Sequence, residues 1–156
     1  MSLLYTPGQL RDAAGLPAET YRHWKKALVP LRRARGHSPS FTPGDLVAVA
    51  IVRVLTDTFG IRVGILSSVA EPLFALCNQS PWPVLERGVM VIEIADARVS
   101  LRQEQGERLP TAAAVVVPLC TLVGGLSETL LASDLPGEQG ALRFPPIAVV
   151  KQGMRS

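Results

Sequence analysis

The motif Thr-Pro-Gly occurs twice in this chain of 156 residues, at positions 6–8 and 42–44. A threonine hydroxyl can cap the free N–H groups at a helix start, and a proline is tolerated at the first helical position because no donor is needed there. Each copy therefore predicts a helix start. We expect the first helix to end at Gly15 and the helix after the second copy to run over residues 44–59, with Gly60 ending it.

Another helix is predicted between these two. Pro17 fits a helix start, and the side chains of Tyr21, Trp24 and Leu28 follow at a spacing that places them on one apolar stripe. We expect this stripe to pack inward, with Tyr21 and Trp24 as core anchors. Two helices joined by a short turn that contains glycine are typical of a helix-turn-helix, in which the second helix is exposed enough to enter the major groove of DNA.

Positive charge is concentrated in the first 59 residues. They hold eight Lys or Arg and four Asp or Glu, so 8 − 4 = +4, whereas the remainder holds 8 basic and 9 acidic residues, or −1, in agreement with the net charge of +3. Six cations and no acid lie between Thr20 and His37. Such a cluster is unfavourable in a folded monomer unless an anion relieves it, which favours a polyanionic partner over a merely solvated surface. Aromatic residues make up only 5% of the chain, so stacking surfaces for single strands are scarce and double-stranded DNA is the expected partner.

The segment 29–42 has apolar residues at both ends and charge with glycine at its tip, which predicts a two-stranded wing. Arginines on such a wing can reach phosphates or a narrow minor groove. The candidate DNA-binding residues come from the start of the first helix, from the second helix and from this wing. They are Thr6, Thr20, Tyr21, Arg22, His23, Lys25, Lys26, Arg32, Arg33, Arg35 and His37.

Five stretches carry a more specific pattern: residues 5–10 (YTPGQL), 14–17 (AGLP), 20–24 (TYRHW), 28–32 (LVPLR) and 41–46 (FTPGDL). Together they resemble the winged helix-turn-helix domain of the MerR family over about residues 4–62. The resemblance implies a sequence-specific transcriptional regulator of bacterial or phage type. By the same resemblance, Thr20 and Arg22 would contact DNA backbone or bases, and Arg32 would hold a phosphate. The long dimerisation helix of that family is missing, so metal or drug sensing is not expected.

The second half is expected to form a small α+β unit, which divides the chain into domains 1–78 and 79–156 and gives an α+β fold class. The helix expected over residues 61–77 cannot continue through the prolines at 81 and 83. The elements expected after it are a hairpin of strands 88–94 and 98–102, a buried strand at 112–117, a helix at 119–132 and a last strand at 146–151.

This second unit is the candidate dimer surface, because no coiled coil is present and helix-turn-helix sites are usually bound by pairs. A small-molecule pocket or docking of another protein remains an alternative for it. No paired carboxylates, Ser/His/Asp order or phosphate-binding glycine loop stands out, so neither an enzyme nor a cofactor is expected. An architectural, recombination or packaging accessory protein and a protein-interaction adaptor are the alternative functions.

Four potential metal ligands, His23, His37, Cys77 and Cys120, lack metal-site spacing. We expect both cysteines to be buried thiols in a reducing cytoplasm. Arg53 lies inside an apolar helix and is expected to extend its head group to solvent. The N-terminus lacks the pattern of a signal peptide, and the apolar run at 112–126 is shorter than the roughly 20 residues of a membrane span, so a cytoplasmic location is expected.

Overall fold

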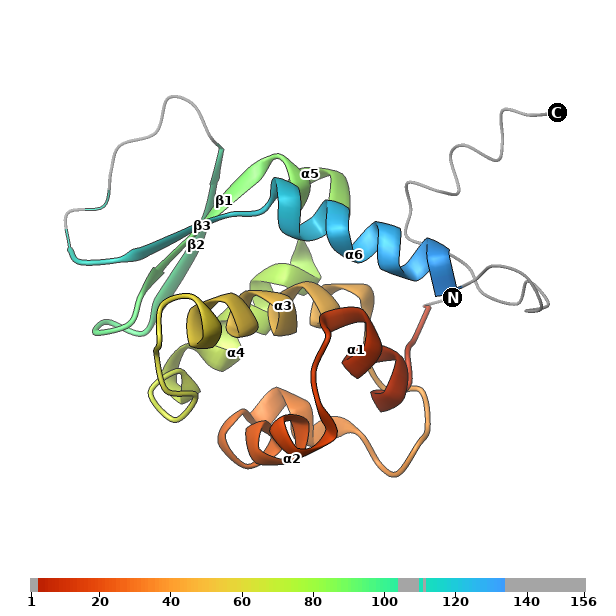
Figure 1. Cartoon of the computed structure of the whole chain (residues 1–156). Helices are drawn as coiled ribbons and strands as arrows, with labels where there is room; N and C mark the ends of the chain where they lie inside the picture. Colours follow the sequence, from red (N-terminus) through yellow and green to blue (C-terminus); the bar gives the residue numbers. More distant parts are fainter. Residues whose placement is uncertain (1–2, 104–109, 111, 134–156) are drawn as a thin grey trace, which may run out of the picture.

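The computed structural model describes residues 3–103, 110 and 112–133. Along the chain these residues form α1 (Pro7–Ala14), α2 (Ala18–Ala27), the 3₁₀ helix η1 (Val29–Arg33), α3 (Pro43–Asp57), α4 (Ser67–Gln79), α5 (Trp82–Glu86), β1 (Gly88–Glu93), β2 (Arg98–Gln103), β3 (Val115–Pro118) and α6 (Cys120–Ser133) (Figure 1). The predicted α+β class is confirmed. The strand predicted at 146–151 lies outside the described residues.

Both Thr-Pro-Gly copies start helices, as predicted. The Thr6 hydroxyl accepts from the Gln9 N–H at 3.1 Å, and the Gln9 side chain accepts from the Thr6 N–H at 2.9 Å. Thr42 and Asp45 repeat this arrangement at the start of α3, with distances of 3.1 and 2.9 Å. These are reciprocal capping boxes, each of which satisfies two backbone donors that a helix start leaves free.

A left-handed glycine ends α1. Gly15 has φ +66°, the Leu16 N–H donates to the Arg11 carbonyl at 2.8 Å, and the Gly15 N–H donates to the Asp12 carbonyl at 3.3 Å. This is a Schellman motif, and glycine adopts its left-handed position without steric cost. Residues 15–17 therefore form a tight turn, after which α2 begins.

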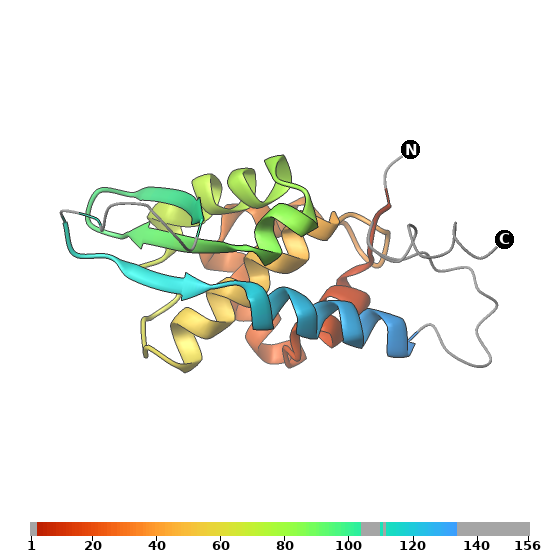
Figure 2. The same ribbon diagram turned by 90° about the horizontal axis from the view of Figure 1, so that it is seen from above.

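The central helix α3 carries most of the packing. It runs between α1 on one side and α6 on the other and also packs against α4 (Figures 1 and 2). Leu46, Val47 and Ile51 are fully buried on it. One continuous hydrophobic core joins these side chains to Leu10 of α1 and to Met90 of β1, so it contains residues from both predicted domains.

The three strands form an antiparallel sheet in the order β2-β1-β3. Ile92 of β1 pairs with Val99 of β2 and with Val115 of β3. The predicted hairpin of β1 and β2 is confirmed. The predicted strand at 112–117 is present as β3, which begins at Val115, but its predicted burial is wrong, because only Val117 on this strand is buried. The predicted helix at 119–132 is present as α6. In Figure 1 the sheet lies at the opposite end of the molecule from α2.

The two-stranded wing predicted over residues 29–42 is wrong. Its first half is η1, and Phe41 forms an isolated bridge with Tyr5, far from that half in sequence. The reason is the spacing of the buried side chains: Leu28, Leu31 and Ala34 are at most 8% exposed. Three-residue spacing is the period of a 3₁₀ helix, in which residues i and i+3 eclipse, whereas a strand would bury alternate residues.

Two other predictions need correction. The helix expected from residue 61 begins only at Ser67, because successive turns occupy the preceding segment, with Ile65 N–H donating to the Arg62 carbonyl at 2.9 Å. The prolines at 81 and 83 end α4, as expected, but they also start the short helix α5, because proline is tolerated in a first helical turn. Among the described residues, no helix combines the length and apolar character needed to cross a membrane.

Candidate nucleic-acid interface

Helix α2 has one buried and one exposed face. Tyr21 is 9% exposed and Trp24 3%, so the prediction that they anchor the core is confirmed. The Tyr21 hydroxyl is also buried, without a hydrogen-bond partner, and burial raises the pKa of Tyr21, with Arg11 acting in the opposite direction. Tyr21, which the sequence placed among the candidate DNA-binding residues, therefore belongs to the core. The Lys25 ammonium lies over its ring, 5.6 Å from the centroid.

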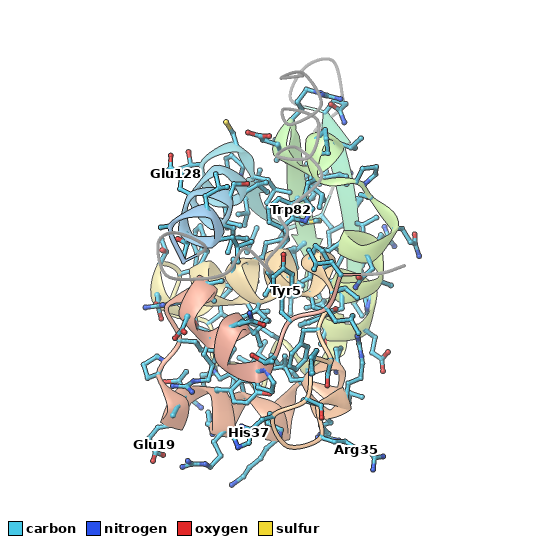
Figure 3. All side chains as sticks on the ribbon, turned by 90° about the vertical axis from the view of Figure 1, so that its right-hand side faces the viewer. Tyr5, Glu19, Arg35, His37, Trp82 and Glu128 are labelled. Carbon is cyan, nitrogen blue, oxygen red and sulfur yellow. The ribbon has the colours of Figure 1, made fainter. Side chains whose placement is uncertain are left out.

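The exposed face of α2 and the following loop form one end of the molecule. Figure 3 shows Glu19, His37 and Arg35 along this end, away from Glu128 of α6. Arg22 pairs with Glu19 at 3.0 Å, with the two side chains 64% and 85% exposed. Such a surface pair is worth little in water, so Arg22 can exchange its partner for another anion at low cost.

Four further candidates occupy this end. His23, Lys26, Arg35 and His37 are exposed. Gly36 lies between the last two with φ +64°, so the chain turns back there and both side chains lie at the tip of the 34–40 loop. Cationic side chains at a loop tip can approach a phosphate backbone without burying charge.

Both threonine candidates are less accessible. Thr20 is partly buried in the first turn of α2, and the Thr6 hydroxyl accepts the capping hydrogen bond described above. The hydroxyl of Thr6 is thus already used in holding the start of α1.

Arg32 interacts with the end of α2. Its Nε donates to the Lys25 carbonyl at 3.0 Å, and its Nη2 donates to the Lys26 carbonyl. Carbonyl groups in the last turn of a helix lack partners within the helix and carry its negative dipole end, so a guanidinium is a favourable cap there.

Arg33 is paired with a buried acid. Its Nη1 lies 3.0 Å from Oδ2 of Asp45, a side chain with no exposed surface. The Thr42 N–H donates to the same carboxylate at 2.9 Å, and Asn78 Nδ2 donates to its other oxygen at 2.9 Å. Asn78 also donates to the Phe74 carbonyl at 2.8 Å. A buried charge is tolerated when it is paired and hydrogen-bonded in this way, and this network joins η1, α3 and α4.

Arg53 has a structural role that the sequence did not indicate. Instead of extending freely into solvent, its Nη1 donates to the Ala14 carbonyl at 2.6 Å and to the Gly15 carbonyl. Its Nε pairs with Asp57 at 2.8 Å. The guanidinium therefore links α3 to the turn between α1 and α2.

A cleft of about 640 Å³ lies beside α2. His23 and Trp24 line it on the α2 side, and Thr56 and residues 60–65 line it on the other. Arg62, which the sequence analysis missed, is exposed here. In the sequence it is a single cation two residues after Gly60, and only the fold places it across the cleft from His23.

The cysteines differ in environment. Cys77 is buried, as predicted, and burial together with the Asp45 carboxylate raises its pKa to about 12. Cys120 is exposed at the first residue of α6, so its predicted burial is wrong. Within the part of the chain that the structure describes, no three His, Cys, Asp or Glu side chains are grouped so that they could hold a metal ion.

No protein-family model matches the chain, and no curated protein and no solved structure is significantly similar to it. The resemblance to the MerR family therefore stays a prediction.

Proposed function

We propose that this protein binds double-stranded DNA and acts as a sequence-specific transcriptional regulator, with α2 in the major groove and the 34–40 loop on flanking phosphates. The observation that carries this proposal is the exposed cationic face of α2, at one end of the molecule and backed by the buried Tyr21 and Trp24. A helix of ten residues is about 15 Å long, and its diameter with side chains, about 10–12 Å, fits a major groove about 12 Å wide.

Each exposed side chain has a distinct part in this proposal. Arg22 and His23 project from the middle of α2 and would meet base edges or the groove wall, because arginine is the commonest reader of guanine. Lys26, Arg35 and His37 would meet phosphates. Arg62, across the cleft from His23, would meet the phosphate backbone beside the groove. Phosphate contacts position the protein, and contacts to bases select the sequence.

A helix-turn-helix of MerR type, with the 34–40 loop in place of a two-stranded wing, and a homodimer through the C-terminal part belong to the same proposal. One recognition helix spans too few base pairs for selective affinity, so a second copy is needed. Two exposed apolar side chains in that part support a dimer surface: Val116 on the edge strand β3 is 44% exposed, and Leu131 on α6 is 43% exposed.

An architectural DNA-binding protein is the second candidate. Helix α2 reads AETYRHWKKA and contains neither asparagine nor glutamine, the side chains that pair with adenine in the major groove. A face made mainly of cations favours the phosphate backbone and would bind many sequences.

Recovery of genomic fragments by the purified protein at near-physiological salt, followed by sequencing, tests both candidates. The regulator predicts one enriched motif with inverted or direct repeats upstream of genes. Diffuse recovery without a motif would favour the architectural candidate. Failure to retain any duplex, even at low salt, would reject DNA binding altogether.

A further inference from the structure

Two arginines contact the backbone at the two ends of the turn–α2 unit, residues 15–27. Arg53 contacts the carbonyls of Ala14 and Gly15, before α2, and Arg32 contacts those of Lys25 and Lys26, at its end. We infer that Arg32 and Arg53 are positioning residues, which hold α2 in the orientation that DNA requires and do not themselves neutralise phosphates. This inference rests on the proposed DNA-binding function.

The first contact fixes the start of the unit to a rigid base. Arg53 projects from α3, the most buried helix, and its Nε–Asp57 ion pair at 2.8 Å orients the guanidinium. Its Nη1 reaches the Ala14 carbonyl, which lies 39 residues before Arg53 in the sequence. The turn is thereby tied to the core by a polar contact in addition to apolar packing.

Close approach at this point depends on Gly15. A Cβ at this residue would lie 2.6 Å from Arg53 Nη1, so the guanidinium would have to move from its place beside the Ala14 and Gly15 carbonyls, and the residue also has φ +66°. Glycine therefore serves the turn twice, once for its backbone conformation and once for the space in which the guanidinium lies.

The second contact fixes the far end. Arg32 lies in η1, whose Leu31 is fully buried, so the segment that carries Arg32 packs against the core. The guanidinium spans two successive carbonyls of α2, a geometry that suits a planar fork of donors and that a lysine ammonium cannot reproduce as well. With both ends held, α2 can neither tilt nor slide without breaking one of these pairs of hydrogen bonds. Recognition groups need placement to within about 0.5 Å, so such restraint affects affinity.

Salt dependence of duplex binding separates positioning from phosphate contact. Each lost phosphate contact flattens the slope of log affinity against log salt by about 0.9, whereas a lost positioning contact lowers affinity at every salt concentration. Arg32→Gln and Arg53→Gln should each weaken binding severalfold with the wild-type slope. Arg35→Gln, at the exposed loop tip, is the control and should flatten the slope by about 0.9. A slope flattened to the same extent by Arg32→Gln or Arg53→Gln would overturn the inference for that residue.

Charge-conserving variants sharpen the test. Arg53→Lys and Arg32→Lys keep the positive charge but lose the two-carbonyl geometry, so their affinity should fall nearly as far as that of the glutamine variants. Full wild-type affinity in the lysine variants would contradict a positioning role, because charge alone would then suffice.

A readout without DNA keeps the inference separate from the proposed function. Trp24 lies on α2, and the chain has one other tryptophan, Trp82, so Trp82→Phe assigns the two indole N–H resonances in an NMR spectrum. Arg32→Gln and Arg53→Gln should shift the Trp24 resonance below the unfolding temperature, whereas Arg35→Gln should not. If the Trp24 resonance is unshifted in both Arg32→Gln and Arg53→Gln, the positioning inference is overturned and the proposed function is not. Failure of the wild-type protein to bind duplex would instead overturn the proposed function.

Discussion

Arg33 and Asp45 form an ion pair of 3.0 Å in which the carboxylate has no exposed surface and the guanidinium side chain is 45% exposed. The pair joins the basic segment to the start of the central helix. Together with the carbonyl contacts of Arg32 and Arg53, it means that the positive charge of the N-terminal segment serves two purposes. Some arginines hold the helices together, and others remain exposed at one end.

The buried position of Asp45 in the Arg33–Asp45 pair predicts that a substitution of Asp45 destabilises the fold. Asp45→Ala should lower the free energy of unfolding by about 2–3 kcal/mol, because the Thr42 N–H and the Asn78 amide would lose buried acceptors. Urea unfolding measures this. Asp12→Ala, an exposed acid on α1, is the matched control and should change stability by less than about 0.5 kcal/mol. Equal effects of the two substitutions would show that the buried network contributes nothing.

Gly15 and Gly36 allow a paired comparison. Both have positive φ, +66° and +64°, but only Gly15 lies against Arg53, and a Cβ at Gly36 would meet nothing within 4 Å. Gly36→Ala should cost about 1 kcal/mol for the left-handed backbone. Gly15→Ala should cost about 1 kcal/mol more, because Arg53 must release carbonyls. The comparison uses thermal or urea unfolding, and identical costs would argue against a role of the Arg53 contact in stability.

Substitution by alanine should change the stability of the fold in opposite directions at Gly44 and Gly124. A Cβ at Gly44 would lie 2.8 Å from the Cys77 carbonyl oxygen and from Asn78 Cα, so alanine would push α3 and α4 apart and destabilise the fold by about 1–3 kcal/mol. Gly124, inside α6, has nothing within 4 Å of its Cβ position, so alanine should stabilise the helix by up to about 1 kcal/mol. A stable Gly44→Ala variant would contradict this close helix packing.

Buried ionisable groups predict alkaline sensitivity. Burial raises the pKa of Tyr5 from 10.0 to about 12, and that of Cys77 from 9.0 to about 12. Their neutral forms are favoured in the folded state, so the corresponding stability is fully present below pH 9 and is lost as pH rises from about 9 towards 12. Tyr5→Phe removes a buried hydroxyl that has no hydrogen-bond partner. This substitution should leave stability at pH 7 nearly unchanged and make the loss of stability at alkaline pH smaller. An unchanged alkaline profile would count against Tyr5 as a source.

Local features of the sequence were sufficient for the starts of α1 and α3 and for the hairpin. The capping threonines, the prolines after them and the alternation in 98–102 act within a few residues, so their outcome does not depend on the rest of the fold. The buried stripe of α2 was also predictable, because Tyr21 and Trp24 stand at helical spacing.

The interaction partner of each arginine was not predictable from the sequence. Whether a cation meets a carbonyl, a carboxylate or solvent depends on partners far away in sequence, as in the contacts of Arg53 with Ala14 and of Arg33 with Asp45. Charge and glycine at a loop tip predict a wing, whereas the spacing of Leu28, Leu31 and Ala34 is that of the 3₁₀ helix found in the structure. Arg62 was missed because only the packing of α3 and α4 brings its turn beside α2.

The most direct test of the central claim is the affinity of the purified protein for a pool of random duplexes, measured by fluorescence anisotropy. The salt concentration is varied from about 50 to 300 mM, over which the Debye length falls from about 14 to about 6 Å. We predict binding at low salt with log affinity falling linearly in log salt, and a slope flattened by about 0.9 for each of Lys26→Ala, Arg35→Ala and Arg62→Ala. No binding at the lowest salt, or three variants with the wild-type slope, would contradict it.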